Sequence, residues 1–174
     1  MTSRAETRRT SAGIAAETAP GRTAVIGLGN ILMSDDGIGR RVIDALDGQV
    51  RDTVDLIDGG TLGFLLLDRL AGCDHLILVD AARMGSAVGE ARVFRDEDVD
   101  GFLLNSTSTS VHEVGLVDLL LMLRLGGNSP RRCSLVCIEP QEVGWGLSLS
   151  PPVEAALAHA VRLVMNEILE VADA

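Results

Sequence analysis

The fold is decided by the stretch VIGLGNILMSDDGIG, residues 25–39. Its apolar start predicts a short buried strand, which stops at Gly29-Asn30 and leads into a helix. Asp35 and Asp36 then fall in the first helical turn, where acidic side chains favour the positive end of the helix dipole. The stretch therefore predicts two carboxylates at a corner between strand and helix, either as part of a site or as plain helix caps.

The remaining chain alternates strands and helices. Apolar and β-branched runs predict strands at 23–29, 53–58, 74–80 and 133–138, a half-exposed edge strand at 90–95, and helices at 35–46, 63–70, 111–125 and 153–171. This alternation is typical of an α/β fold. We expect a three-layer sandwich: a mostly parallel, twisted sheet with a 2-1-3 order of its core strands and helices on both faces.

Length and composition indicate a single domain. The chain has 174 residues, of which 47% are hydrophobic, enough for one sizeable core. We expect the α/β domain to span residues 23–174 and residues 1–22, rich in Arg, Ser, Thr, Ala and Glu, to form a disordered tail. No apolar run reaches the roughly 18 residues that span a bilayer, so no membrane association is expected.

Charge and residue usage exclude several function classes. A net charge of −10 and 2% aromatic residues argue against nucleic-acid binding. The chain has no lysine, which excludes P-loop and Schiff-base chemistry. A dinucleotide fingerprint lacks its third glycine, since Leu32 stands there, and a zincin motif lacks its second histidine at Leu116. Three cysteines, an odd number, predict free thiols in a reducing cytoplasm.

The topology predicts a candidate site from residues far apart in sequence. Ligands of open parallel sheets bind beyond the carboxyl ends of the strands, where Asp36 follows the first strand and Asp80 ends the third. His112, in the first turn after a polar loop, is the best imidazole candidate, because His75 and His159 lie where histidines are more often structural or solvated. Two carboxylates and an imidazole suit nickel or zinc. Each residue also has a purely structural explanation, as a cap or turn residue.

The chain closely resembles the maturation endopeptidases of nickel-iron hydrogenases over nearly all of residues 23–170. The resemblance is carried by GLGNILMSDDGIG at 27–39, DGGT at 58–61, DHLILVD at 74–80, SVHEVGL at 110–116, IEP at 138–140 and GLSLSP at 146–151. In proteins similar to this one, a metal is held by an acidic residue of the first motif, by the Asp that closes the third strand and by the His after the loop. These match Asp36, Asp80 and His112, with Asp36 in a position that is Glu in some members.

The resemblance implies a cytoplasmic, metal-dependent endopeptidase that removes the C-terminal extension of a hydrogenase large-subunit precursor after nickel insertion. Asp36, Asp80 and His112 would be both catalytic and metal-binding, with nickel supplied by the precursor and zinc or another divalent ion able to substitute. Asp58, Gly59 and Gly60 would position the substrate, although Asp58 also suits a plain turn. We expect a monomer whose partner is the precursor. The alternative is a nickel-binding chaperone that docks the precursor without cutting it.

Overall fold

The structure is a computed structural model that describes residues 21–61, 66–105 and 111–172. Within these ranges, the side chains of residues 105, 111–114 and 171–172 are not described.

A five-stranded sheet forms the centre of the molecule, with the strand order β2-β1-β3-β5-β4. The strands are β1 (Thr23–Leu28), β2 (Val54–Gly60), β3 (His75–Ala81), β4 (Ala91–Arg95) and β5 (Arg132–Ile138). The first four in this order run parallel, and β4 pairs antiparallel with β5 at the edge. The predicted 2-1-3 order and the half-exposed edge strand are therefore confirmed.

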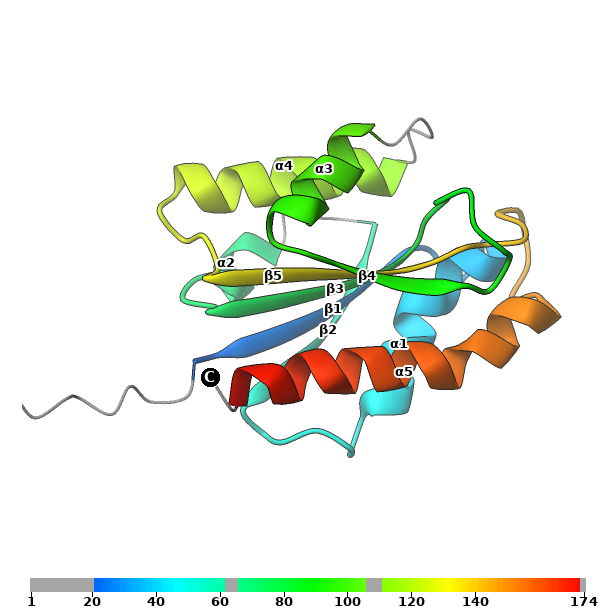
Figure 1. Ribbon diagram of the computed structural model, residues 1–174, viewed down its shortest axis with the longest axis horizontal. Helices are drawn as coiled ribbons and strands as arrows, with labels where there is room; N and C mark the ends of the chain where they lie inside the picture. Colours follow the sequence, from blue (N-terminus) through cyan, green and yellow to red (C-terminus); the bar gives the residue numbers. More distant parts are fainter. Residues whose placement is uncertain (1–20, 62–65, 106–110, 173–174) are drawn as a thin grey trace, which may run out of the picture.

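Helices cover both faces of the sheet and complete the predicted three layers (Figure 1). One face carries α1 (Ile38–Leu46) and α5 (Pro151–Ala172), and the other carries α2 (Leu67–Leu70), α3 (Glu97–Asn105) and α4 (Val111–Leu125). None of the helices in the described ranges is long and apolar enough to cross a membrane.

Two apolar cores lie on the two sides of the sheet. Val25 and Ile77 pack with α1 and α5, whereas Ile26 and Leu78 pack with the leucines of α4. Successive residues of a strand point to opposite faces, so a strand that is covered on both sides must be apolar throughout. This requirement explains the continuous apolar runs from which the parallel strands were predicted.

The helix predicted at 35–46 starts later than expected. A 3-10 turn, η1 (Ser34–Gly37), comes first and α1 follows it. A Cβ on Gly27 would lie 2.3 Å from the carbonyl oxygen of Gly39, and a Cβ on Gly39 would lie equally close to a backbone oxygen of β1. The backbones of α1 and β1 can touch only because both positions are glycine. The tighter turn brings the chain into this contact.

The segment 81–104, in which the sequence shows only weak periodicity, contains the unpredicted helix α3. Phe102 of α3 stacks on Phe94 of β4, with ring centroids 4.5 Å apart, and Val99 is buried. Glu97 and Asp98 lie in its first turn, where the helix dipole favours acidic side chains. The helix predicted at 63–70 is seen only as α2, because residues 62–65 lie outside the described ranges.

The folded domain includes Arg22, which the predicted boundary assigned to the tail. Its guanidinium donates to a carboxylate oxygen of Asp55 and to the carbonyl oxygens of Arg69 and Ala71. Its backbone N–H donates to Asp74. These contacts attach the start of β1 to the neighbouring connections. Residues 1–20 lie outside the described ranges, so for them the tail stays a prediction.

Candidate active site

The candidate site lies at the carboxyl end of the sheet, between β1 and β3. Asp36 belongs to η1, directly after β1, and Asp80 is the next-to-last residue of β3. Gly27 of β1 lies opposite Val79 of β3, so Asp80 follows beside the last residue of β1. Because η1 also contacts β3, Asp36 and Asp80 lie at the same edge of neighbouring strands. The topological argument from the sequence placed them there.

Both carboxylates are almost completely buried, with exposed fractions of 4% for Asp36 and 3% for Asp80. Oδ2 of Asp36 accepts a hydrogen bond of 2.7 Å from the backbone N–H of Asn30. This bond runs back to the turn after β1 and not forward into the helix, so Asp36 is more than a helix cap. The bond from Asn30 holds the Asp36 carboxylate in a fixed position at the end of β1.

Asp35, the other carboxylate of the motif, anchors a loop. Its side chain is fully buried, and it accepts hydrogen bonds from the backbone N–H groups of Gln141, Glu142 and Ser150 and from the Ser150 hydroxyl. Burial raises the pKa of this carboxyl, but the bonds from Ser150, Glu142 and Gln141 outweigh burial and hold the pKa below its usual value. Helix capping is therefore the wrong explanation for Asp35, which fastens the loop before α5 to η1.

A further carboxylate, that of Glu139, plays the same part for the loop after β3. It is buried, and its Oε2 accepts bonds from the backbone N–H of Met84 at 2.6 Å and from the N–H and hydroxyl of Ser86. The loop that follows Asp80 is thereby tied to the end of β5. Asp35 and Glu139 together fix the two loops that border the candidate site.

His112 lies in the first turn of α4, as predicted, but its side chain lies outside the described part of the structure. Ser110, the first residue of the SVHEVGL motif, lies wholly outside the described residues. Figure 1 shows that α4 starts towards the carboxyl end of the strands and runs back across the sheet. Leu78 packs in the core beneath α4, and side-chain alternation along β3 points Asp80 to the same face. His112 and Asp80 thus belong to the same side of the sheet.

The predicted substrate-positioning residues, Asp58, Gly59 and Gly60, end β2 beside β1. Asp58 is half exposed; it forms an ion pair with Arg40 of α1 and accepts a hydrogen bond from the N–H of Gly60. A Cβ on Gly59 would come within 2.6 Å of the Ile26 side chain, and Gly60 has a φ of +50°. These contacts give each residue a structural role at the rim of the site. Their contact with a substrate stays a prediction.

No group of three or more His, Cys, Asp or Glu side chains arranged to hold a metal occurs among the residues with described side chains. The predicted set includes His112, whose imidazole falls outside them. The donors that are described suit a divalent ion, because Asp36 and Asp80 bring two carboxylates to one buried edge. The three-ligand set therefore stays a prediction.

The family of hydrogenase maturation proteases described as HycI matches residues 40–167. This chain belongs to that family. The chain is 38% identical over 152 residues to the hydrogenase 2 maturation protease of Escherichia coli K12, covering 86% of this chain and 92% of that protein. It is 35% identical over 156 residues to the hydrogenase expression/formation protein HoxM of Azotobacter vinelandii, covering 88% and 74%.

Solved structures of maturation proteases share the fold. The hydrogenase-maturating endopeptidase HybD of Escherichia coli superposes with a TM-score of 0.79 at 38% identity, over 86% of this chain and 93% of that one. The nickel-iron hydrogenase maturation protease HybD of Thermococcus kodakarensis gives 0.72 at 26% identity, over 83% and 97%. The chain is thus a peptidase of the hydrogenase maturation family, as the sequence motifs indicated.

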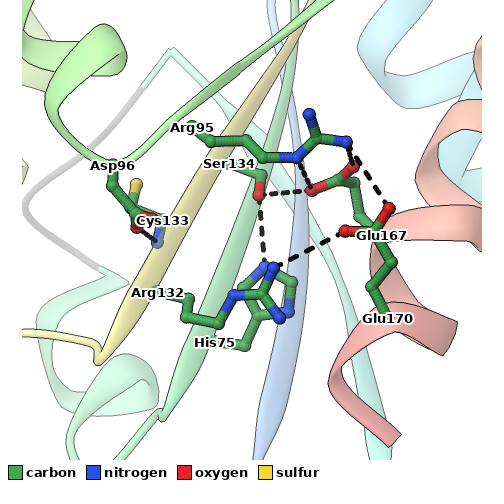
Figure 2. A network of polar contacts seen from close by, with 8 residues as sticks. All are labelled: His75, Arg95, Asp96, Arg132, Cys133, Ser134, Glu167 and Glu170. Atoms are coloured by element: carbon green, nitrogen blue, oxygen red, sulfur yellow. Dashed lines mark hydrogen bonds and ion pairs between the residues drawn. The ribbon is translucent and has the colours of Figure 1, made fainter. Parts of the chain in front are cut away.

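A second polar cluster of this maturation protease lies at the opposite, amino end of the sheet (Figure 2). The fully buried His75 places Nε2 3.3 Å from the Ser134 hydroxyl oxygen, and that hydroxyl donates to Glu167 of α5 at 2.7 Å. Glu167 also forms an ion pair with Arg95. The cluster contains Ser, His and Glu, yet the hydroxyl bonds to the carboxylate and all three side chains are buried. In a hydrolytic triad the carboxylate bonds to the histidine and the hydroxyl is open to the substrate, and this cluster has neither feature. Its bonds tie α5 to the sheet.

We expect His75 to make stability depend on pH. Burial, aided by the charge of Arg132 and opposed by Glu167 and Asp96, lowers its pKa from 6.5 to about 4. Between these values the unfolded chain binds a proton that the folded chain excludes, so stability falls as the pH falls, by about 3 kcal/mol at pH 4. Urea unfolding from pH 7 to 4 measures this loss.

Replacing His75 by glutamine should remove this part of the pH dependence, because glutamine does not titrate. His159→Gln, at an exposed position of α5, is the matched control and should keep the wild-type slope. Equal slopes in the wild-type protein and the His75→Gln variant would show that His75 does not control the loss.

Proposed function

We propose that this peptidase removes the C-terminal extension of a nickel-iron hydrogenase large-subunit precursor after nickel insertion. The relatives named as hydrogenase maturation proteases support a hydrogenase precursor as the substrate. The observation that carries the proposal is the pairing of two buried carboxylates, Asp36 and Asp80, at the carboxyl ends of neighbouring strands. The start of α4, with His112, lies on the same side of the sheet as Asp80.

In this proposal the nickel belongs to the substrate. Asp36, Asp80 and His112 bind the ion that the precursor already carries, and zinc or another divalent ion can take its place in vitro. Binding holds the adjacent peptide bond in one orientation, which lowers the entropic part of the barrier to hydrolysis. A divalent ion so held supplies Lewis acidity towards a carbonyl oxygen or a water molecule.

The chain's own residues keep the donors in place. Asn30 fixes Asp36 through its N–H, and Asp35 and Glu139 fix the bordering loops. We propose that Asp58, with Gly59 and Gly60, contacts the peptide next to the scissile bond. Its ion pair with Arg40 is exposed and can open at little cost.

We place the reaction in the cytoplasm, with the protein acting as a monomer on its precursor. All three cysteines, Cys73, Cys133 and Cys137, are free thiols, which suits a reducing compartment. Cys73 and Cys137 are buried, and burial raises the pKa of Cys133 to about 12, so none of them is poised to act as a nucleophile.

The proposal is tested by the mass of the large subunit. The purified protein is incubated with nickel-loaded precursor and, separately, with nickel-free precursor, and intact mass spectrometry follows the large subunit. We expect a C-terminal peptide to be lost from the nickel-loaded form alone. If both forms are cut equally, the nickel requirement is wrong. An unchanged mass with tight binding supports instead the non-cleaving nickel chaperone.

A further inference from the structure

Large apolar side chains gather on two loops at the carboxyl end of the sheet. One loop follows β1 and the other precedes α5, and their exposed members are Ile31, Leu32, Val143, Trp145 and Leu147. We call these five side chains the Trp145 platform. Trp145 is 85% exposed, although it is the only tryptophan of a chain with just three phenylalanines and no tyrosine. The largest aromatic side chain of the protein, Trp145, therefore lies outside the core.

The two loops are joined to each other by their backbones. Met33 and Gly146 form a parallel bridge, in which Ser34 N–H donates to the Gly146 carbonyl at 2.9 Å and Gly146 N–H donates to the Leu32 carbonyl at 3.0 Å. A Cβ on Gly146 would lie 2.3 Å from the Ser34 hydroxyl oxygen, so a side chain there would force that hydroxyl to move. The pairing places Leu32 beside Trp145, the residues that precede the bridge on each loop.

Hydrogen bonds to Asp35 and from Arg41 attach the second loop to η1 and α1. Asp35 binds the second loop at Gln141, Glu142 and Ser150, on both sides of Trp145 in the sequence. The Arg41 guanidinium donates to the carbonyl oxygen of Leu147 at 3.2 Å. The apolar side chains are therefore exposed on a fixed framework. An exposed tryptophan that shares two bridged loops with exposed aliphatic side chains has the composition of an interface hot spot.

The platform is continuous with the candidate site. Ile31 and Leu32 directly follow Asn30, the residue that holds the Asp36 carboxylate, and Asp36 and Asp35 are adjacent in η1. A polypeptide bound at Asp36 and Asp80 would therefore pass close to the loop that carries Ile31 and Leu32. The five side chains of the platform are uncharged, so apolar contact is the interaction that they can offer to a partner.

We infer that the Trp145 platform is the docking surface for an apolar segment of the precursor polypeptide beside its scissile bond. This inference rests on the proposed function, which supplies the precursor as partner. The platform recognises peptide side chains, whereas Asp36, Asp80 and His112 recognise the metal. Docking is then separable from the chemistry: loss of the platform weakens binding of the precursor and leaves the rate of the bound complex unchanged.

Trp145 itself can report on docking. Full-length protein labelled with 5-fluorotryptophan has a single ¹⁹F signal, because Trp145 is the only tryptophan. We expect unlabelled nickel-free precursor, which is not cleaved under the proposed function, to shift and broaden this signal. A signal unmoved by nickel-free and nickel-loaded precursor overturns the inference. A signal that moves when the protein alone is concentrated also overturns it, because the platform then binds a second copy.

Steady-state processing gives the second test. Trp145→Ser should raise KM for the nickel-loaded precursor by about 10-fold or more and change kcat less than about twofold. Leu147→Ser should also raise KM, because it removes an apolar side chain of the platform. The bond from Arg41 is to the main-chain carbonyl of residue 147, so the substitution leaves that bond in place. The matched control is Leu125→Ser, 79% exposed at the end of α4, which should leave both constants unchanged.

The outcomes separate the two proposals. If the wild-type protein shortens the precursor and Trp145→Ser keeps the wild-type KM, the platform is not the docking surface and the proposed function stands. A fall in kcat alone likewise overturns the docking role. If the wild-type protein does not shorten the precursor, the proposed function fails, and the ¹⁹F signal still decides whether Trp145 contacts that polypeptide.

Discussion

Replacing Asp35 by alanine should lower the free energy of unfolding by about 3–5 kcal/mol, the cost of leaving several buried groups unpaired. Three backbone N–H groups and the Ser150 hydroxyl would lose their acceptor, and Ser150, which provides two of the four donors, is buried. The loop that carries Trp145 would lose its side-chain attachment to η1 and keep only the backbone bridge at Gly146, so we expect processing to fall as well. Urea unfolding and the precursor assay measure the two effects.

The control for Asp35 is Asp47→Ala, which removes the same charge at an exposed position after α1 and should change stability by less than about 0.5 kcal/mol. The lowered pKa of Asp35 adds a check by pH. Its contribution is fully present above the ordinary carboxyl pKa and is lost as the pH falls through the lower, folded value. The difference between wild type and Asp35→Asn should therefore shrink only in strong acid. A difference that is already absent at pH 7 would contradict the anchoring role.

Asp36→Asn and His112→Ala should each reduce the processing rate by at least about 100-fold, because each removes a donor to the precursor's nickel. Asparagine keeps the shape of the aspartate and can still accept the Asn30 N–H, so the loss in Asp36→Asn reports the missing charge. His112→Ala should unfold at the wild-type temperature, since a residue in the first turn of a surface helix contributes little to the core. Rates of precursor shortening and thermal unfolding test both statements.

His159→Ala, at an exposed position in α5, is the control for the histidine and should process precursor at the wild-type rate. Asp80→Asn should match Asp36→Asn in its loss of activity. Normal processing by His112→Ala would remove this residue from the site. So would an experimental structure in which its imidazole lies far from Asp36 and Asp80.

The sequence was sufficient to predict the parallel core and the positions of two candidate site residues for a physical reason. Strand order and handedness follow rules that apply to any βαβ unit, so the positions of Asp36 and Asp80 at the ends of neighbouring strands could be derived without coordinates. The 3-10 turn and the close approach of Gly27 to Gly39 could not, because only the packed backbone reveals them.

The roles of Asp35 and Glu139 were also beyond sequence reasoning. Asp35 binds residues 106 to 115 positions away, and Glu139 binds residues 53 to 55 positions away, so no local pattern announces either bond. Both residues lie in motifs that the family resemblance highlighted, but resemblance alone does not separate a loop anchor from a metal ligand. The exposure of Trp145 likewise became visible only in the structure.

The bond between Asp35 and Ser150 has a consequence for the order of events during synthesis. Asp35 emerges from the ribosome early, yet its partners at 141–150 are made more than a hundred residues later. Until these residues are made, the Asp35 carboxylate lacks its hydrogen-bond donors. The turn that carries Asp36 is then not yet stabilised. Such distant pairing slows folding, because a long loop must close before the contact forms. A nascent chain that has not yet produced residues 141–150 should therefore be inactive.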